Sequence, residues 1–199
     1  MTASHDPTAQ IWELVAGQWQ QKATIGHADW VRNTSFSPDG HYLATASDDN
    51  TVQIWELLAG QWQKKVTLQH SQSVKDANFS PDGRHLATAT SGFLGGSAQI
   101  WELVAGQWQK KATIEHSMGV NRVSFSPDGR HLVTASDDKT AKIWGRFAGQ
   151  WQEKATISSH TSDVKRARFS PDGSQLVTAS ADRTAKVWLL KSGENNDIS

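Results

Sequence analysis

Three sets of polar side chains recur along the chain with identical spacing, and their residue types could support acid–base chemistry. In each set a threonine follows a histidine after 18 residues, an aspartate follows after 4 more, and a tryptophan after a further 6. The sets are His27, Thr45, Asp49, Trp55; His116, Thr134, Asp138, Trp144; and His160, Thr178, Asp182, Trp188. A base that a carboxylate orients beside a hydroxyl is the arrangement used in nucleophilic catalysis. Three copies of one catalytic centre would be unexpected, however, whereas a structural fastener would be needed in every unit.

The composition narrows the kinds of site that the chain could carry. No cysteine occurs among the 199 residues, which excludes thiolate metal sites, disulfides and cysteine nucleophiles. The 20 basic and 20 acidic residues cancel, so we expect no nucleic-acid partner. The N-terminal residues lack a signal-peptide pattern, and no apolar run approaches membrane-spanning length. We therefore expect a cytoplasmic protein with no membrane partner.

Short strands in a repeating unit must position the recurring residues. The motif FSPDG begins at Phe36, Phe79, Phe125 and Phe169. Its proline and glycine suit the second and fourth positions of a type I turn. Runs rich in β-branched and aromatic residues predict four strands per unit, called a, b, c and d, which in the first unit are residues 31–37, 42–48, 51–57 and 60–68. Strand d alternates glutamine and lysine with apolar residues, and lysine discourages edge-to-edge pairing, so we expect d to be the outermost strand.

This pattern resembles the WD40-repeat β-propeller family, in which each four-stranded antiparallel sheet is one blade of a ring. The resemblance covers residues 8–190 and rests on the period, the histidine before strand a and the tryptophan that ends strand c. The chain departs from the family name because its pairs are Trp-Glu three times, Trp144-Gly145 and Trp188-Leu189. The resemblance implies an all-β fold with about four blades, starting near residues 27, 70, 116 and 160.

The family also implies a role for the recurring residues, which in such blades form a hydrogen-bonded chain called the structural tetrad. The donor and acceptor inventory fits this role, because tryptophan only donates while threonine relays between it and the histidine. A histidine engaged in this way is not available to a metal ion. We therefore expect no metal, no other cofactor and no enzymatic activity.

The number of strands of each kind bears on how the ring closes. Residues 8–25 predict a c strand and a d strand ahead of the first blade, and 1–7 and 191–199 are expected to be tails. The chain thus holds five c strands but four each of a, b and d. We expect two chains to form one eight-bladed ring, each N-terminal d strand completing the last blade of the other chain. The alternatives are a one-chain ring of four blades and a ring of another size. Because Trp188 has a full tetrad, we expect it to keep its place and residues 1–14 to be displaced or loosely held.

The second unit breaks the pattern between strands b and c. Three extra residues lie between Thr88 and Trp101, and the turn has no aspartate, so His70 loses its expected partner. The segment SGFLGGS predicts a flexible loop that exposes Phe93 and Leu94. Two interpretations stay open: a partner-binding tip, and drift in a loop that has lost its tether.

Binding surfaces in propellers that resemble this chain lie on the face with the d–a and b–c loops. Residues beside the repeated valine of strand a differ between the units there, and variation on a common scaffold suits recognition. The candidates are Trp30, Arg32, Lys75, Asn121 and Lys165. Trp30 is the best anchor, because an aromatic ring with a polar group binds strongly at interfaces; it could equally cover a neighbouring loop. The basic residues would form a rim for an acidic peptide or phosphate, offset by Asp48, Asp137 and Asp163.

The sequence therefore favours a non-catalytic scaffold that binds an unknown protein or peptide partner. We expect two copies of the chain to form a homodimer. Two alternatives remain at this stage. The near-identical AGQWQ segments also fit an engineered or excised repeat fragment without a specific ligand. A hydrolase that uses the mouth of the propeller is the other alternative, although no unrepeated catalytic constellation supports it.

Overall fold

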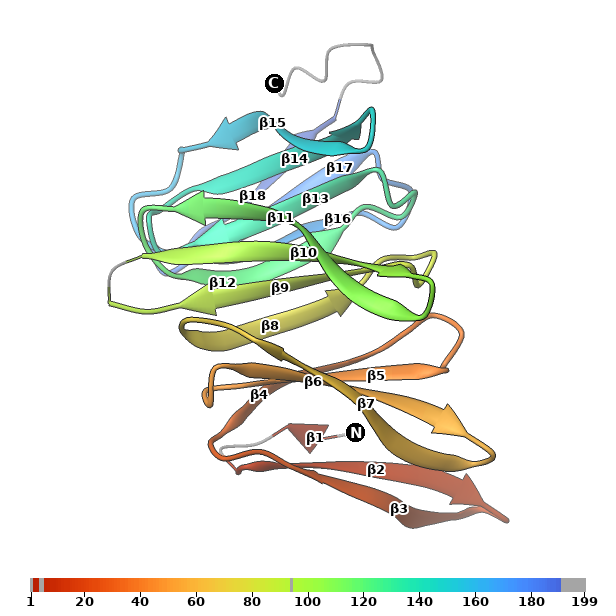
Figure 1. The fold of residues 1–199 in the computed structure, drawn as a ribbon. Helices are drawn as coiled ribbons and strands as arrows, with labels where there is room; N and C mark the ends of the chain where they lie inside the picture. The colour runs from red at the N-terminus through yellow and green to blue at the C-terminus, as the bar shows by residue number, and fades with distance from the viewer. Residues whose placement is uncertain (1, 4–5, 94, 191–199) are drawn as a thin grey trace.

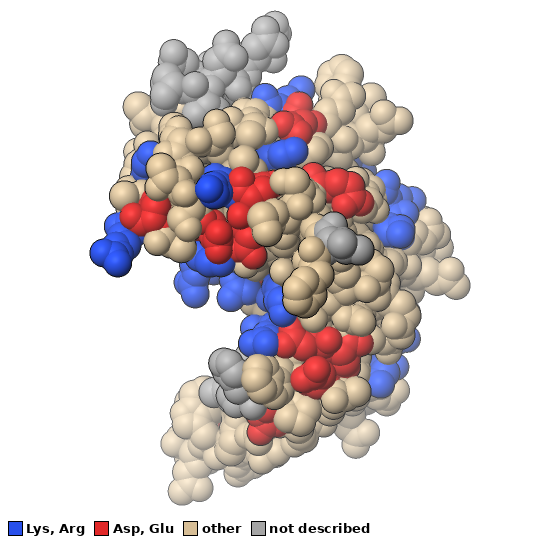
Figure 2. Space-filling view, turned by 90° about the vertical axis from the view of Figure 1, so that its left-hand side faces the viewer, with Lys and Arg blue, Asp and Glu red and all other residues tan. Residues whose placement is uncertain are grey.

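A stack of five antiparallel sheets makes up the fold (Figure 1). The computed structural model describes residues 2–3, 6–93 and 95–190. Every regular element in these residues is a β-strand, and none of the described strands of the first sheet pairs with a strand of the last. The sheets follow one another from the N-terminal to the C-terminal end of the stack, which curves into a crescent with one hollowed side (Figure 2). The all-β prediction is confirmed, and the described chain is an open arc.

Three of the sheets are complete blades whose four strands follow the order a, b, c, d. The first is β4 (Val31–Phe36), β5 (Tyr42–Ser47), β6 (Thr51–Leu58) and β7 (Gln61–Gln69). The second is β8 (Ser73–Phe79), β9 (His85–Ser91), β10 (Gly96–Val104) and β11 (Gln107–His116). The third is β12 (Val120–Phe125), β13 (His131–Ser136), β14 (Ala141–Phe147) and β15 (Gln150–Ile157). In each blade strand d lies at the sheet edge, beside strand c.

Local turn chemistry fixes where these strands end. In the a–b turn, Asp39 Oδ1 accepts from His41 N at 3.0 Å, and Gly40 N donates to Ser37 O at 2.9 Å. Gly40 has a φ of 70°, which glycine adopts without steric cost. The c–d turn has positive φ at both Ala59 and Gly60, 48° and 78°. Two central residues of this kind give a tight hairpin whose twist matches the flanking strands.

The two end sheets have three strands each. The last sheet, β16 (Val164–Phe169), β17 (Gln175–Ser180) and β18 (Ala185–Leu189), lacks a d strand among the described residues. The first sheet contains β2 (Thr8–Val15), β3 (Gln18–Gly26) and an unexpected short strand, β1 (Thr2–Ala3).

Strand β1 corrects the prediction that residues 1–7 form a tail. It pairs Thr2 with Gln10 and Ala3 with Ala9, in the register in which β5 pairs Thr45 with Gln53. The reason is visible in the sequence, since MTASHDPTAQIW repeats the pattern of ATASDDNTVQIW at the end of strand b. The predicted tail at 191–199 lies outside the described residues.

Neighbouring blades pack face to face through two unlike surfaces. We call the surface of a blade that covers the following blade its leading face, and the opposite surface its trailing face. The leading face of the first complete blade is small and fully buried, with Ala44, Ala46, Val52 and Ile54 each 0% exposed. It packs on Val74, Leu86, Trp101 and Trp108 of the second blade's trailing face. The same pairing of faces recurs at the other three blade contacts.

The irregular segment of the second blade is a hairpin, where a flexible loop was expected. Thr90 and Ser97 are joined through their hydroxyl groups and backbone, with Ser97 N donating to Thr90 Oγ1 at 3.1 Å. Gly92 N then donates to Gly95 O at 3.1 Å. Phe93 is fully exposed at the tip, and Leu94 lies outside the described residues. The extra residues therefore lengthen β9 and β10.

Candidate interaction site

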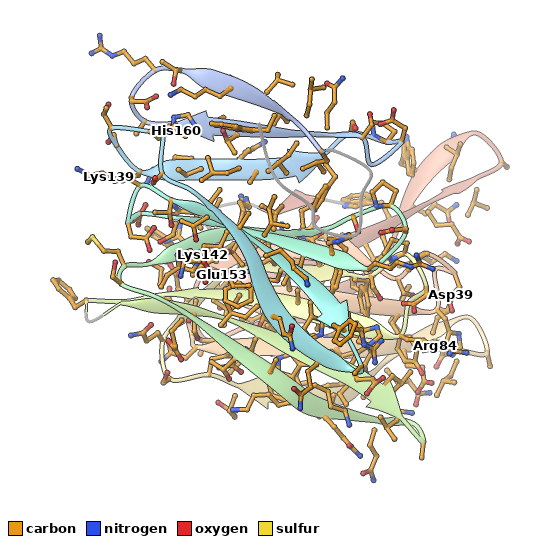
Figure 3. All side chains as sticks on the ribbon, turned by 90° about the horizontal axis from the view of Figure 1, so that it is seen from above. Asp39, Arg84, Lys139, Lys142, Glu153 and His160 are labelled. Atoms are coloured by element: carbon orange, nitrogen blue, oxygen red, sulfur yellow. The ribbon has the colours of Figure 1, made fainter. Side chains whose placement is uncertain are left out.

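The recurring histidines lie at the edge of the sheets that carries the b–c turns and the d–a loops. Figure 3 shows His160 and Lys139 at this edge, with Asp39 and Arg84 of the a–b turns at the opposite edge. His27 Nδ1 lies 2.9 Å from Asp49 Oδ2, and its Nε2 lies 2.7 Å from Thr45 Oγ1. In the third and fourth blades all corresponding distances are 2.8 Å, for His116 with Asp138 and Thr134, and for His160 with Asp182 and Thr178. The structure thus brings together histidine, threonine and aspartate in each predicted set.

Among the three predicted sets, tryptophan takes part in the series of hydrogen bonds in one only. Trp188 Nε1 donates to Thr178 Oγ1 at 3.1 Å. The Nε1 atoms of Trp55, Trp101 and Trp144 are buried without a hydrogen-bond acceptor in the described structure. In those blades the threonine hydroxyl lies near a carbonyl of strand c, such as Gln53 O at 3.4 Å from Thr45. The four-membered chain that the family implies is therefore a three-membered one in the sets of Trp55 and Trp144.

These sets are arranged for structure. A carboxylate only accepts hydrogen bonds, so Nδ1–H of each histidine donates to its aspartate and Nε2 accepts from the threonine hydroxyl. The side chains of His27, His116 and His160 are each 0% exposed. Burial lowers the pKa of His27 and His116, against the opposing effect of their aspartates. Enclosed imidazoles with both nitrogens engaged are not placed to take a proton from a substrate. Within the described residues no group of histidines, aspartates and glutamates is arranged to hold a metal ion.

In the second blade, a backbone carbonyl takes the place of the missing aspartate beside His70. Its Nδ1 lies 3.2 Å from Leu68 O, and its Nε2 lies 2.9 Å from Thr88 Oγ1. Burial lowers the pKa of His70 to about 4, and the Leu68 carbonyl offsets this only in part. The second blade therefore keeps the link between its histidine and threonine without the charged partner.

Two ion clusters, each organised by an aspartate of a b–c turn, hold the predicted rim residues. In the first cluster Asp48 accepts from Arg32 Nε and from Lys75 Nζ, each at 2.7 Å. Burial acts to raise the pKa of Asp48, but the bonds from Arg32 and Lys75 hold it below the ordinary value. The Arg32 guanidinium lies 4.8 Å from the ring centroid of Trp30, which is 41% exposed. Trp30, Arg32 and Lys75 thus form one connected surface.

The second cluster surrounds Asp137. Asn121 Nδ2 and Lys165 Nζ each donate to Asp137 Oδ1 at 2.7 Å, and Lys165 also reaches Asp163 at 2.8 Å. Burial tends to lower the pKa of Lys165, and its two carboxylate partners raise it overall. Asp48, Asp137 and Asp163 therefore offset the charge of the basic rim through direct ion pairs.

Both clusters border one open hollow of about 480 Å³. Its lining residues are Arg32, Lys75, Asn121, Arg122, Lys165 and Arg166. Four of the five predicted partner-binding residues thus meet at this hollow, and Trp30 lies beside it under Arg32. Basic and acidic side chains gather on the hollowed side of the crescent (Figure 2).

Sequence reasoning missed Arg122 and Arg166 because it considered only the residues directly beside the repeated valine of strand a. In β12 the pairing jumps from Val120 to Arg122, and β16 has the same irregularity. A bulge of this kind changes the direction of neighbouring side chains, so that two consecutive residues line the hollow. The available signal was variation at the next position as well, where the units carry Asn33, Asp76, Arg122 and Arg166.

Asp76 takes this bulge position in the second blade and faces the third blade. Its carboxylate accepts from Val123 N at 3.0 Å and from Asn78 Nδ2 at 3.1 Å, and it lies 3.6 Å from Arg122. Burial raises the pKa of Asp76 despite the nearby guanidinium. Asp76 thereby links two blades and helps to position Arg122 at the hollow.

The described residues contain no helical segment with the length and apolar character that membrane crossing requires.

Comparison with known proteins agrees with the blade architecture. A family model described as "WD domain, G-beta repeat" matches residues 19–56, 62–102, 108–145 and 151–188. Each match runs from a d strand through strands a, b and c of the next blade, so the sequence repeat and the structural blade differ in phase by one strand.

One curated relative resembles part of the chain. A Lissencephaly-1 homolog of Heterostelium pallidum is 50% identical over 42 residues, which cover 21% of this chain and 10% of that protein. The chain therefore matches only a small part of this relative. The four family matches, in contrast, take up most of the chain, and each spans the four strands of one sequence repeat. On this evidence, the protein belongs to the WD40 repeat family.

Proposed function

We propose that the chain is a non-catalytic protein-interaction scaffold that binds an acidic segment of a protein partner at the hollow. The observation that carries this proposal is the convergence of five basic side chains from four different blades on one open surface. Arg166 forms no ion pair within the described residues, and it lies beside Lys165, whose aspartates a ligand carboxylate can replace. Charge-assisted hydrogen bonds from arginine give such contacts geometric specificity.

Selection of displayed peptides against the purified chain tests this function. We expect enrichment of peptides with several carboxylates, and an affinity loss of at least tenfold with Arg166→Glu. Lys110→Glu is the matched control, because Lys110 is exposed on the outer strand β11 and should leave binding unchanged. Binding that is indifferent to Arg166→Glu would refute the hollow as the site. Absence of any specific peptide would favour a repeat fragment without a ligand.

We further propose that two chains close one eight-bladed ring. Support comes from the two end sheets, which lack complementary strands in the described chain and leave large apolar side chains exposed. Open sheet edges promote unwanted pairing, and a symmetric closed assembly removes them. Light scattering at micromolar concentration should give twice the chain mass. A persistent mass of one chain would contradict the closure.

A further inference from the structure

The last blade exposes the kind of surface that every complete blade buries. On its leading face Val177 is 42% and Val187 is 63% exposed. The residues at the same positions of the third blade, Val133 and Ile143, are 0% and 3% exposed because the last blade covers them. The last blade therefore presents a finished contact surface that nothing in the described structure covers.

The first sheet is an incomplete blade rather than an independent hairpin. Ala9, Ile11 and Ile25 are buried against the first complete blade, as a leading face would be. On its opposite face Trp12 is 40% and Trp19 is 67% exposed. Trp108, which takes the position of Trp19 in the second blade, is only 9% exposed. This sheet supplies strands c and d, packed as in a complete blade, but among the described residues it has no strand a and only two residues of strand b.

Asp6 extends this correspondence to the tetrad. Asp6 Oδ1 accepts from Thr8 N and Thr8 Oγ1, each at 2.8 Å. Asp49 Oδ1 holds Thr51 in the same way at 2.9 and 2.6 Å, while its Oδ2 receives His27. Asp6 thus has the geometry of a tetrad aspartate, and in the described part of the chain its carboxylate forms no hydrogen bond with a histidine.

Continuing from the ring closure proposed above, we infer that β2 and β3 of one copy enter the last blade of a second copy together and release its β18. In this joint blade β2 pairs with β17 of the second copy along the edge where β1 pairs with it in the described chain, so β1 must leave that edge. Trp12 and Asp6 then take the places of Trp188 and Asp182 beside His160 and Thr178 of that copy. The inference reverses the expectation that residues 1–14 are the displaced segment.

The contacts of β2 favour it over β18 as the shared c strand. Glu13 on β2 binds Lys22 on β3 at 2.7 Å, as Glu56 binds Lys65 at 2.8 Å within a complete blade. Strand β18 carries Leu189 at this position, so β3 would lose the ion pair beside β18. Entry as a hairpin also keeps the whole β2–β3 pairing, from Thr8 with Gly26 to Val15 with Gln18. In the joint blade, the five residues of β17 that now pair with β18 would pair with β2 in the same register.

Disulfide trapping tests the exchange, because the chain has no cysteine of its own. Gln175 lies opposite Leu189 in the observed last blade, and it would lie opposite Glu13 in the joint blade. Leu190 N donates to Ser174 O next to this pair, which makes it the close, non-hydrogen-bonded kind. Such a separation suits a disulfide. The two double variants are E13C/Q175C and, as a matched control, Q175C/L189C, all at exposed positions.

We expect E13C/Q175C to form disulfides between chains in a species of two-chain mass, and Q175C/L189C to stay largely reduced. Efficient Q175C/L189C disulfides at two-chain mass, without disulfides in E13C/Q175C, would leave the ring standing and overturn the strand exchange. A disulfide in E13C/Q175C within a single chain would place the joint blade in one copy and overturn the second copy. One-chain mass without any disulfide in E13C/Q175C would refute both the closure and the exchange.

Discussion

At the residue scale, His70 makes the stability of the second blade sensitive to pH. Its folded pKa of about 4 lies below the ordinary value of 6.5, so the unfolded chain binds a proton that the folded chain excludes. Stability is therefore full above pH 6.5 and falls as the pH decreases toward 4. Between pH 7.5 and 5.5 the loss from this group is about 1 kcal/mol. Urea unfolding at both pH values should show a smaller pH dependence for His70→Gln; an unchanged difference would contradict the assignment.

In the third blade, the contributions of Thr134 and Trp144 to stability can be measured separately. Thr134→Val removes the hydroxyl that serves His116 Nε2 at 2.8 Å and leaves that buried acceptor unsatisfied. We expect a loss of about 1–3 kcal/mol. Trp144→Phe should cost less, because the Trp144 indole N–H already lacks an acceptor in the described structure. Chemical unfolding of both variants measures the difference, and a larger cost for Trp144→Phe would show that the indole is hydrogen bonded.

At the element scale, the long hairpin of the second blade should be protected except at its tip. Ala87, Ala89, Ala98 and Ile100 of β9 and β10 are each 0% exposed, as in the regular blades. Hydrogen exchange follows local opening, which buried and paired strands resist. We expect the amides of 86–89 and 98–101 to exchange as slowly as those of β5 and β13. Fast exchange throughout 86–101 would instead indicate that the missing aspartate loosens the whole blade.

At the scale of the whole molecule, one charge on the last leading face should prevent ring closure. Val177 lies on β17, which stays in the joint blade, and covering a buried glutamate there would leave its charge unpaired. We expect Val177→Glu to shift light scattering from two-chain to one-chain mass while its circular dichroism stays β-like. Val187→Glu, on the released β18, should keep the two-chain mass. Two-chain mass in Val177→Glu would place this face outside the interface.

The sequence alone determined the all-β fold, the strand positions and the spacing of the His, Thr and Asp sets. These features follow from local causes: the turn residues of SPDG, the alternation within strands and a period repeated with little change. Even the short strand β1 had a sequence signal in MTAS, although its relation to the end of strand b went unnoticed.

Only the tertiary structure decided that Arg122 and Arg166 join the predicted rim residues at the hollow, and which aspartate binds which rim residue. The bulges in strand a bring Arg122 and Arg166 to the surface beside Asn121 and Lys165. Asp137 then joins Asn121 and Lys165 across two blades, an arrangement that no single repeat encodes. The tryptophan donors likewise differ between blades, since Trp188 reaches its threonine in the described structure while Trp55 and Trp144 do not. All these outcomes are set by distances between side chains that are remote in the sequence, and such distances exist only once the sheets have packed.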